Sequence, residues 1–215
     1  TVVGSANMRE GSSVFSTWFV LSTILFGEAL TFTLEWPEWG RCPDLAVQQN
    51  FNVVNYQGKW WEQAAYNNER VEGNARCVHT IYSLTPSGNG VVTVENRAIV
   101  EKTNKWEGIN GTAFEADPSK NEGKLIVSFP VGIFGHVEGP YWVLGTDYNS
   151  YTVVYSCQNF LFFWRYYTIW FLGRYQIFPT DEDQADFFRK ANQVLEVHNF
   201  DPSMMHLSNQ MNCDI

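Results

Sequence analysis

The sequence is short of basic residues, cysteines and metal-ligand patterns, and each shortage excludes a class of function. It has 14 Lys and Arg against 23 Asp and Glu, a formal charge of -9. Such a charge repels phosphate backbones, so nucleic acid is not an expected partner. No Cys-X-X-Cys occurs, and His79, His136, His198 and His206 lack ligand spacing, so no metal site is expected. We also find no glycine-rich phosphate loop and no nucleophile elbow.

Aromatic and apolar residues are abundant by contrast. Of 215 residues 45% are apolar, and the chain contains 9 Trp, 10 Tyr and 16 Phe. This composition excludes disorder and is enough to bury the core of one domain. Broad aromatic side chains suit the interior face of a sheet, so the composition favours a β protein.

The N-terminal segment is interpreted as a targeting signal. After Met8 and Arg9, an apolar run covers 14–26, which is shorter than the roughly 20 residues that span a bilayer. Gly27 and Ala29 then place small residues two apart, which predicts a signal peptide within 1–29, cleaved after Ala29. Secretion and a single domain over 30–215 follow. A buried N-terminal helix is the alternative interpretation of this segment. Residues 1–7 lie upstream of Met8, the expected start of the protein.

The four cysteines stand far apart in the sequence, at Cys42, Cys77, Cys157 and Cys213. In an oxidising compartment this even number indicates two disulfides, and three pairings are open.

Asn110-Gly111-Thr112 matches the acceptor pattern for an N-linked glycan. The glycines on either side of Ile109-Asn110 suggest an exposed turn where a glycan fits. An unused acceptor is the alternative.

Short β-rich runs follow one another at hairpin spacing with turn residues between them. Eight strands are predicted, over 59–66, 77–84, 91–100, 106–115, 124–129, 141–146, 151–157 and 166–173. One helix begins at Thr180, where Asp183 completes a capping-box-like start, and ends at 199–202. Its apolar stripe consists of Phe187, Phe188, Ala191, Val194 and Leu195.

Eight antiparallel strands form either a sandwich or a closed barrel, and closure removes the exposed sheet edges. We therefore predict an all-β fold, an eight-stranded antiparallel up-and-down barrel with one C-terminal α-helix packed outside. A barrel of this size has room for its own side chains or for one small ligand.

Three short motifs stand in order along the chain: Gly58-Lys59-Trp60, Thr146-Asp147-Tyr148 and Leu172-Gly173-Arg174. Together they resemble the three elements of the lipocalin family pattern. Gly58 permits a sharp backbone turn, Trp60 plugs the end of the barrel, and Arg174 lies over the indole. Asp147 is expected to brace its turn, so all these roles are structural.

The resemblance covers most of 41–213 and extends to the apolipoprotein D-like group with its insect bilin-binding and insecticyanin relatives. It implies pairing of Cys42 with Cys157 and of Cys77 with Cys213. It also implies that Tyr82, Asn96 and Trp170 line the cavity. Alternation along 59–66 places Glu62, Ala64 and Tyr66 on the side of Trp60. Glu62 is expected either to be paired low in the barrel or to contact the ligand.

The resemblance implies a secreted, non-enzymatic carrier of one small hydrophobic ligand, such as a fatty acid, sterol-like lipid or retinoid, with no required cofactor. A biliverdin-binding chromoprotein is the first alternative. An enzyme of the prostaglandin D synthase kind needs a free thiol, which the implied pairing removes. The third alternative is an interaction module that contacts a membrane, lipoprotein, receptor or second copy through an apolar patch. The patch would consist of Val131, Ile133, Phe134, Leu161, Phe162, Phe163 and Trp164.

Overall fold

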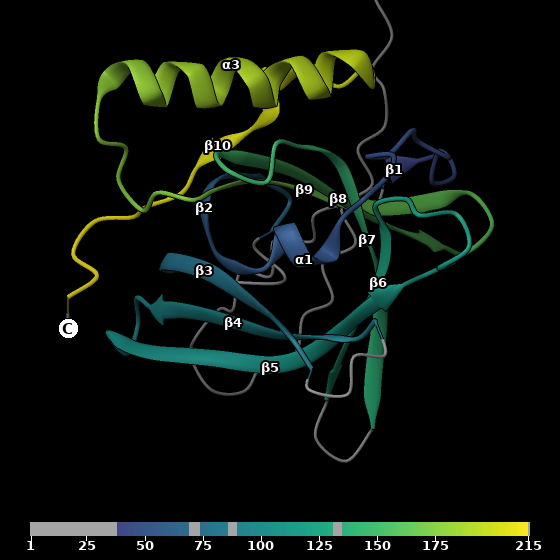
Figure 1. Cartoon of the computed structure of the whole chain (residues 1–215), viewed down its shortest axis with the longest axis horizontal. Coiled ribbons are helices and arrows are strands. Elements are labelled where there is room, and N and C mark those ends of the chain that lie inside the picture. The colour runs from purple at the N-terminus through teal and green to yellow at the C-terminus, as the bar shows by residue number, and fades with distance from the viewer. Residues whose placement is uncertain (1–37, 69–73, 86–89, 131–134, 215) are drawn as a thin grey trace, which may run out of the picture. The chain divides into compact units, whose positions relative to one another are not determined.

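The computed structural model describes residues 38–68, 74–85, 90–130 and 135–214, which form an antiparallel sheet closed into a barrel (Figure 1). Eight strands build the barrel wall: β2 (Gly58–Tyr66), β3 (Ala75–Leu84), β4 (Val92–Val100), β5 (Lys105–Glu115), β6 (Lys124–Pro130), β7 (His136–Thr146), β8 (Tyr151–Phe160) and β9 (Trp164–Gly173). Each pairs with the next in the chain, and β9 returns to pair with β2. The predicted up-and-down barrel is confirmed.

Four short elements that the sequence did not indicate complete the domain. The strand β1 (Glu38–Trp39) extends the sheet beside β9, and β10 (His206–Leu207) pairs with β2. A single helical turn, α1 (Val53–Tyr56), precedes β2, and the 3-10 turn η2 (Pro202–Met204) precedes β10. Elements this short owe their conformation to the neighbours with which they pair, so a propensity pattern does not reveal them.

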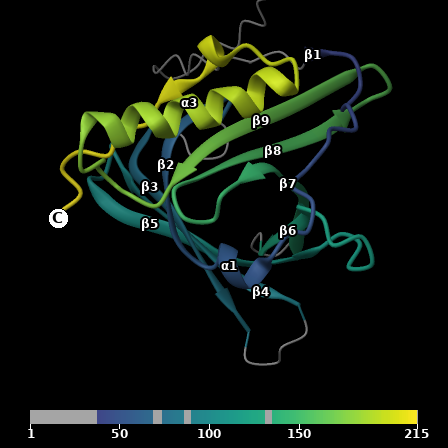
Figure 2. The same ribbon diagram turned by 45° about the horizontal axis from the view of Figure 1, so that its top comes forward.

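The helix α3 (Asp181–Val197) lies on the outer face of the barrel, chiefly against β8 and β7 (Figure 2). The Thr180 side chain accepts a hydrogen bond from the Asp183 N–H at 3.1 Å, which is the expected cap. Phe187, Ala191 and Leu195 are buried against the outer side chains of the sheet. The predicted helix, its start and its apolar face are confirmed.

β7 begins at His136, five residues before the predicted start of the strand at Tyr141. Gly139 and Pro140 suggest a turn, yet both pair with β6, opposite Val127 and Ile126. The paired register with β8 starts only at Trp142, opposite Tyr155, so the missing N–H of Pro140 breaks no ladder with β8. Proline is tolerated in the strand for this reason.

The predicted turn at Asn110 is wrong, because Asn110 lies within β5 opposite Glu95. Its side chain is exposed, and its Oδ1 accepts a hydrogen bond from Arg97 at 3.1 Å. The neighbouring Gly111 allows β6 to approach β5 closely, since a Cβ there would lie 2.4 Å from the Ser128 carbonyl oxygen. Glycosylation of Asn110 stays a prediction.

Strand β2 does not alternate regularly, because its pairing with β9 shifts between Glu62 and Ala64. The shift is a bulge at Gln63 that moves the following side chains to the opposite face. Ala64 packs in the outer cluster beneath α3, and Tyr66 packs against the same cluster. The prediction that both share the inner side with Trp60 is therefore wrong.

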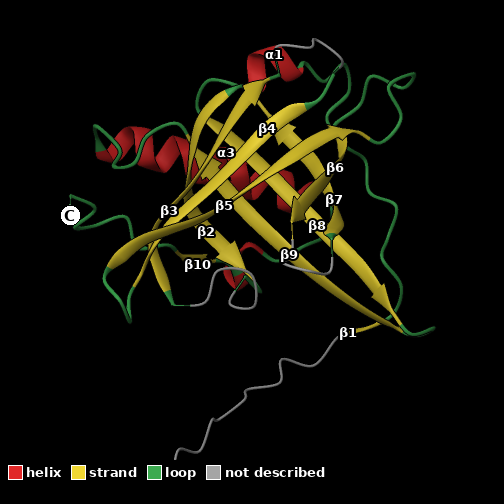
Figure 3. Ribbon diagram, turned by 90° about the horizontal axis from the view of Figure 1, so that it is seen from below, coloured by secondary structure: helices red, strands yellow, loops and turns green. Residues whose placement is uncertain are grey.

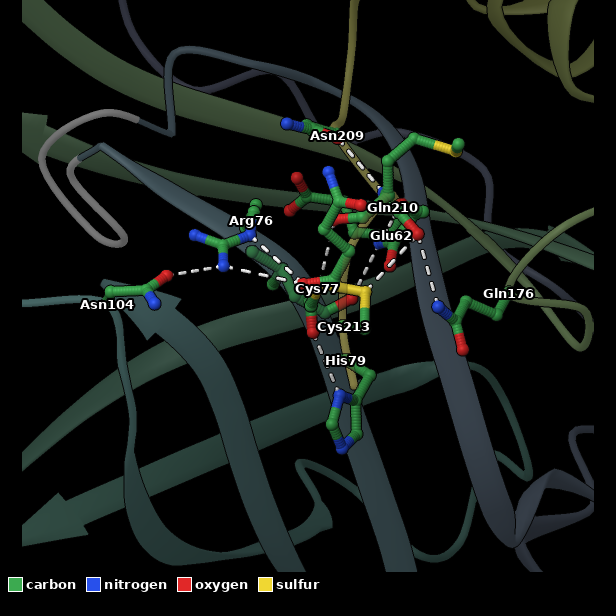
Figure 4. Close-up of a disulfide and its surroundings, with 12 residues drawn as sticks. Glu62, Arg76, Cys77, His79, Asn104, Gln176, Asn209, Gln210 and Cys213 are labelled. Carbon is green, nitrogen blue, oxygen red and sulfur yellow. Dashed lines mark hydrogen bonds between the residues drawn. A yellow bond between two sulfur atoms is a disulfide. The ribbon is translucent and has the colours of Figure 1, made fainter. Parts of the chain in front are cut away.

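Two disulfides join the ends of the domain to the barrel, Cys42–Cys157 and Cys77–Cys213. This is the pairing that the resemblance implied, and it uses all four cysteines. Figure 4 shows the second disulfide, beside which Arg76 donates to Asn104 Oδ1 at 2.6 Å. The C-terminal tail is thus fixed along β2 and β3.

Some sequence predictions fall on parts of the chain that the structure does not describe. The predicted signal peptide in 1–29 lies outside the described residues, as do Val131, Ile133 and Phe134 of the predicted mouth patch. No helix in the described ranges combines the length and apolar character that a membrane crossing needs.

Candidate ligand-binding site

One end of the barrel, here called the closed end, is sealed by Trp60 and Arg174. Trp60 is completely buried, and its indole Nε1 donates a hydrogen bond to the Tyr56 carbonyl oxygen at 2.9 Å. The Arg174 guanidinium carbon lies 3.7 Å from the centroid of the Trp60 ring. A cation on an aromatic face is stabilised by about 0.5–1 kcal/mol at exposed sites and by about 2 kcal/mol when desolvated, and the half-buried Arg174 lies between these cases.

Backbone carbonyl oxygens hold the Arg174 guanidinium over the ring. Its nitrogens donate to Tyr148 O at 3.0 Å, Lys59 O at 3.0 Å and Asn55 O at 3.3 Å. Burial lowers the pKa of Arg174 from its ordinary value, although the group remains charged at neutral pH. Gly58 has a φ of 93°, and a Cβ there would lie 3.2 Å from the guanidinium, so glycine fits both requirements.

The second motif makes the tight turn between β7 and β8. One Asp147 carboxylate oxygen accepts hydrogen bonds from three successive backbone N–H groups, those of Asn149 at 3.1 Å, Ser150 at 2.7 Å and Tyr151 at 3.0 Å. The Lys190 Nζ of α3 lies 3.5 Å from the other oxygen. Burial acts to raise the pKa of Asp147, but the hydrogen bonds from Ser150 and the backbone outweigh it and hold the pKa below its ordinary value.

We expect Asp147→Asn to lower the melting temperature at pH 7 and to do so less at pH 3. A carboxylate with a depressed pKa in the folded state stabilises the protein above the unfolded value of 3.8, and this contribution is lost as the pH falls through the folded pKa. Thermal unfolding of both proteins at the two pH values measures the difference. An equal gap at pH 7 and pH 3 would contradict this role.

The barrel encloses a cavity of about 280 Å³ on the inner side of the seal. Its wall is mostly aromatic and aliphatic, and includes Tyr82, Val94, Asn96, Val127, Phe129, Tyr141, Trp170 and Leu172. The structure therefore brings together the three residues that the resemblance implied, Tyr82, Asn96 and Trp170. Phe129, Val137 and Gln158 belong to strand ends that lie away from the closed end.

Three tyrosine hydroxyls form a chain toward the closed end. Tyr82 donates to the Tyr141 oxygen at 2.7 Å, Tyr141 and Tyr56 lie 3.0 Å apart, and Tyr56 lies 3.3 Å from Thr152 Oγ1. Burial raises the pKa of Tyr56 to about 12 and raises the pKa values of Tyr82 and Tyr141 well above their ordinary range. These hydroxyls therefore stay protonated and neutral at physiological pH.

Comparison with known proteins agrees with this architecture. The family description "Lipocalin-like domain" matches residues 51–166, which is more than half of the chain. The chain belongs to the lipocalin family. Apolipoprotein D of Oryctolagus cuniculus is 31% identical over 174 residues, covering 81% of this chain and 85% of the relative. The bilin-binding protein of Pieris brassicae is 36% identical over 119 residues, covering 55% of this chain and 59% of the relative.

Solved structures show the same fold. Insecticyanin from the tobacco hornworm Manduca sexta superimposes on this lipocalin with a TM-score of 0.66 at 23% identity, over 81% of this chain and 87% of that one. A biogenic amine-binding protein superimposes with a TM-score of 0.61 at 17% identity, over 80% and 89% of the two chains.

Glu62 is buried in this lipocalin but does not line the cavity. Its carboxylate accepts hydrogen bonds from Asn68 Nδ2, 3.2 Å from each oxygen, and from the Ser208 hydroxyl. Gln210 Nε2 donates to the Glu62 carbonyl oxygen at 2.7 Å (Figure 4). Of the two expectations for Glu62, a paired carboxylate or a ligand contact, these hydrogen bonds match the first. The carboxylate lies beneath the C-terminal tail.

The sequence reasoning missed Tyr56, Tyr141 and Thr152. A usable signal existed for Tyr141, because it stands two residues before Val143 in one strand and both side chains belong to the inner cluster. No local pattern identifies Tyr56, since it ends a single helical turn and reaches the site through tertiary packing.

Proposed function

We propose that this lipocalin is a secreted carrier that holds one small hydrophobic molecule, such as a fatty acid, sterol-like lipid or retinoid, inside the barrel. The cavity of about 280 Å³, sealed at one end by Trp60 and Arg174, is the observation that carries the proposal. Moving apolar ligand surface out of water contributes roughly 25 cal/mol per Å². The two disulfides suit an oxidising, extracellular compartment.

The polar groups of the cavity wall set the orientation of the ligand; they belong to Thr80, Tyr82, Asn96, Glu138, Tyr141, Ser156 and Gln158. The Asn96 amide oxygen accepts a hydrogen bond from Thr80 Oγ1 at 2.8 Å, which fixes the amide in the wall. The Tyr82 and Tyr141 hydroxyls add neutral hydrogen-bonding groups to the same wall. A ligand with one polar group and an apolar body fits this arrangement.

A substitution that fills the cavity should weaken ligand binding without unfolding the barrel. We expect Val127→Trp to weaken the binding of all-trans-retinol, used as a fluorescent probe, by at least about tenfold, because the larger ring occupies the ligand volume. Fluorescence titration measures the affinity, and circular dichroism checks the fold.

The matched control is Val197→Trp, the same change at a 76% exposed position on α3. We expect it to keep the affinity of the parent protein. Failure of the parent protein to bind retinol, fatty acids and sterols alike would refute the carrier proposal, and equal affinities of the two variants would refute this location.

A bilin-binding chromoprotein is the second candidate, suggested by the Pieris brassicae relative. The cavity of about 280 Å³ lies just below the range of about 300–1,000 Å³ for ligand pockets, which favours a slender lipid over a tetrapyrrole. An absorption band in the red on adding biliverdin would support the chromoprotein instead.

The thiol-enzyme alternative loses its nucleophile, because all four cysteines are joined in disulfides. The carrier proposal requires no cofactor and no catalytic group, and the bound lipid itself is the cargo.

A further inference from the structure

The hairpin between β8 and β9 ends in a run of exposed apolar side chains. Phe160, Leu161, Phe162 and Phe163 are 57%, 70%, 82% and 60% exposed, and Trp39 beside them is 69% exposed. We call these five residues the aromatic tip. No charged residue occurs in 158–164. Soluble proteins rarely expose so many adjacent large apolar groups without a partner for them.

The aromatic tip is held in place by the segment that precedes the barrel. The Trp39 and Phe163 rings stack with centroids 5.5 Å apart and planes 7° from parallel. Glu38 forms an ion pair with Arg165 at 3.0 Å, and the Cys42–Cys157 disulfide ties the same segment to β8. The exposed rings therefore sit on a braced three-stranded ribbon of β1, β9 and β8.

The β8–β9 hairpin and β1, which carry the aromatic tip, lie at the end of the barrel opposite α1 (Figure 3). Gln158, two residues before Phe160, lines the cavity, as does Val137, which is itself 55% exposed. The apolar tip and the open side of the cavity thus share one end of the barrel.

The dimensions of the tip favour a lipid surface over a second copy of the chain. Its five side chains expose on the order of 700 Å² in total, given roughly 150–250 Å² for each large side chain. A stable protein interface needs about 800 Å² on each partner, in a patch that matches the other surface. Consecutive residues at a hairpin apex point to different sides, which suits immersion better than face-to-face docking.

We propose that the aromatic tip inserts into the surface of a zwitterionic lipid bilayer and so presents the open end of the barrel to the membrane. Tryptophan is enriched where a protein crosses a lipid–water interface, and the tip contains Trp39, whose ring packs edge-on against that of Trp164. The formal charge of -9 opposes approach to an anionic surface, which leaves phosphatidylcholine-like surfaces as the matching partner. This docking goes beyond ligand carriage and does not depend on a bound ligand.

Flotation with phosphatidylcholine vesicles tests the proposal. The parent protein should float with the vesicles, and the double variant Leu161→Ser/Phe162→Ser should lose at least about tenfold in partition coefficient, because two apolar side chains no longer enter the lipid. The matched control Val197→Ser/Leu207→Ser removes side chains that are 76% and 74% exposed elsewhere, and should float like the parent. Phe162→Ser alone is the second tip variant, since its side chain contributes least to the fold.

Replacing a third of the lipid by phosphatidylserine should weaken binding at low salt. Stronger binding to these vesicles, no flotation of the parent protein, or an equal loss in the control would overturn the proposal. Sedimentation without lipid provides the remaining test: self-association that disappears in the tip variant would assign the tip to a second copy. The retinol affinity of the double tip variant is measured in parallel and should equal that of the parent protein. This measurement separates a failure of membrane docking from a failure of ligand carriage.

Discussion

Replacing Trp60 by alanine is expected to destabilise the protein by about 3–5 kcal/mol, the range for truncating a large buried aromatic side chain. The indole is fully buried, its N–H satisfies the Tyr56 carbonyl, and its ring supports the Arg174 guanidinium. Its loss leaves a void, an unpaired carbonyl oxygen and a cation without its aromatic neighbour. For a domain of this size the melting temperature should fall by roughly 6–20 °C.

The neighbouring Trp61 provides the control, because the same substitution there removes an equal volume from the outer face of the same strand. Trp61 is only half-buried and contacts the His79 ring at 4.5 Å and the Lys59 ammonium at 4.9 Å. We expect Trp61→Ala to cost less than half as much as Trp60→Ala in urea unfolding. Equal losses would show that Trp60 does not seal the barrel.

Removing either disulfide is expected to lower the free energy of unfolding by about 2–5 kcal/mol. The linked cysteines are separated by 115 and 136 residues, so each bond restricts a long loop in the unfolded chain. The chain-entropy account gives about 5 kcal/mol for loops of this length, and native-state strain and residual unfolded structure reduce it. Urea unfolding of Cys42→Ser/Cys157→Ser and of Cys77→Ser/Cys213→Ser, without reductant, measures both effects.

Hydrogen exchange distinguishes the two variants. Without the Cys77–Cys213 bond, the tail is held by the β10 pairing and by hydrogen bonds alone, among them those of Gln210 to Glu62 O and Val78 O and that of Ser208 to Glu62. We therefore expect amides of 206–213 to lose protection while β4 to β8 keep theirs. A loss below about 1 kcal/mol in both variants would contradict the stabilising role of the cross-links.

Local patterns in the sequence were sufficient for most of the fold. Turn residues between β-rich runs predicted all eight barrel strands, and the 3- and 4-residue spacing of Phe187, Ala191 and Leu195 predicted the outer helix. The boundary errors arose where pairing overrides propensity. Pro140 is tolerated in β7 because the paired register with β8 starts only at Trp142, and Asn110 lies in β5 because Gly111 allows β6 to approach.

The side-chain predictions succeeded or failed for the same reason. Tyr82, Asn96 and Trp170 line the cavity, as the family resemblance implied. Ala64 and Tyr66 could not be placed by alternation, because the bulge at Gln63 is set by the register between β2 and β9. Register depends on residues more than a hundred positions away, which a local pattern does not contain.

By itself, the sequence determined the class of fold, the order of its strands and helix, and the three motifs at the closed end, since these depend on periodicity and on turn chemistry between near neighbours. Only the tertiary structure decided the hydroxyl chain of Tyr56, Tyr82 and Tyr141, the burial of Glu62 beneath Ser208, and the stack of Trp39 on Phe163. Each of these joins residues that are distant in sequence, and their separations follow from how the barrel closes.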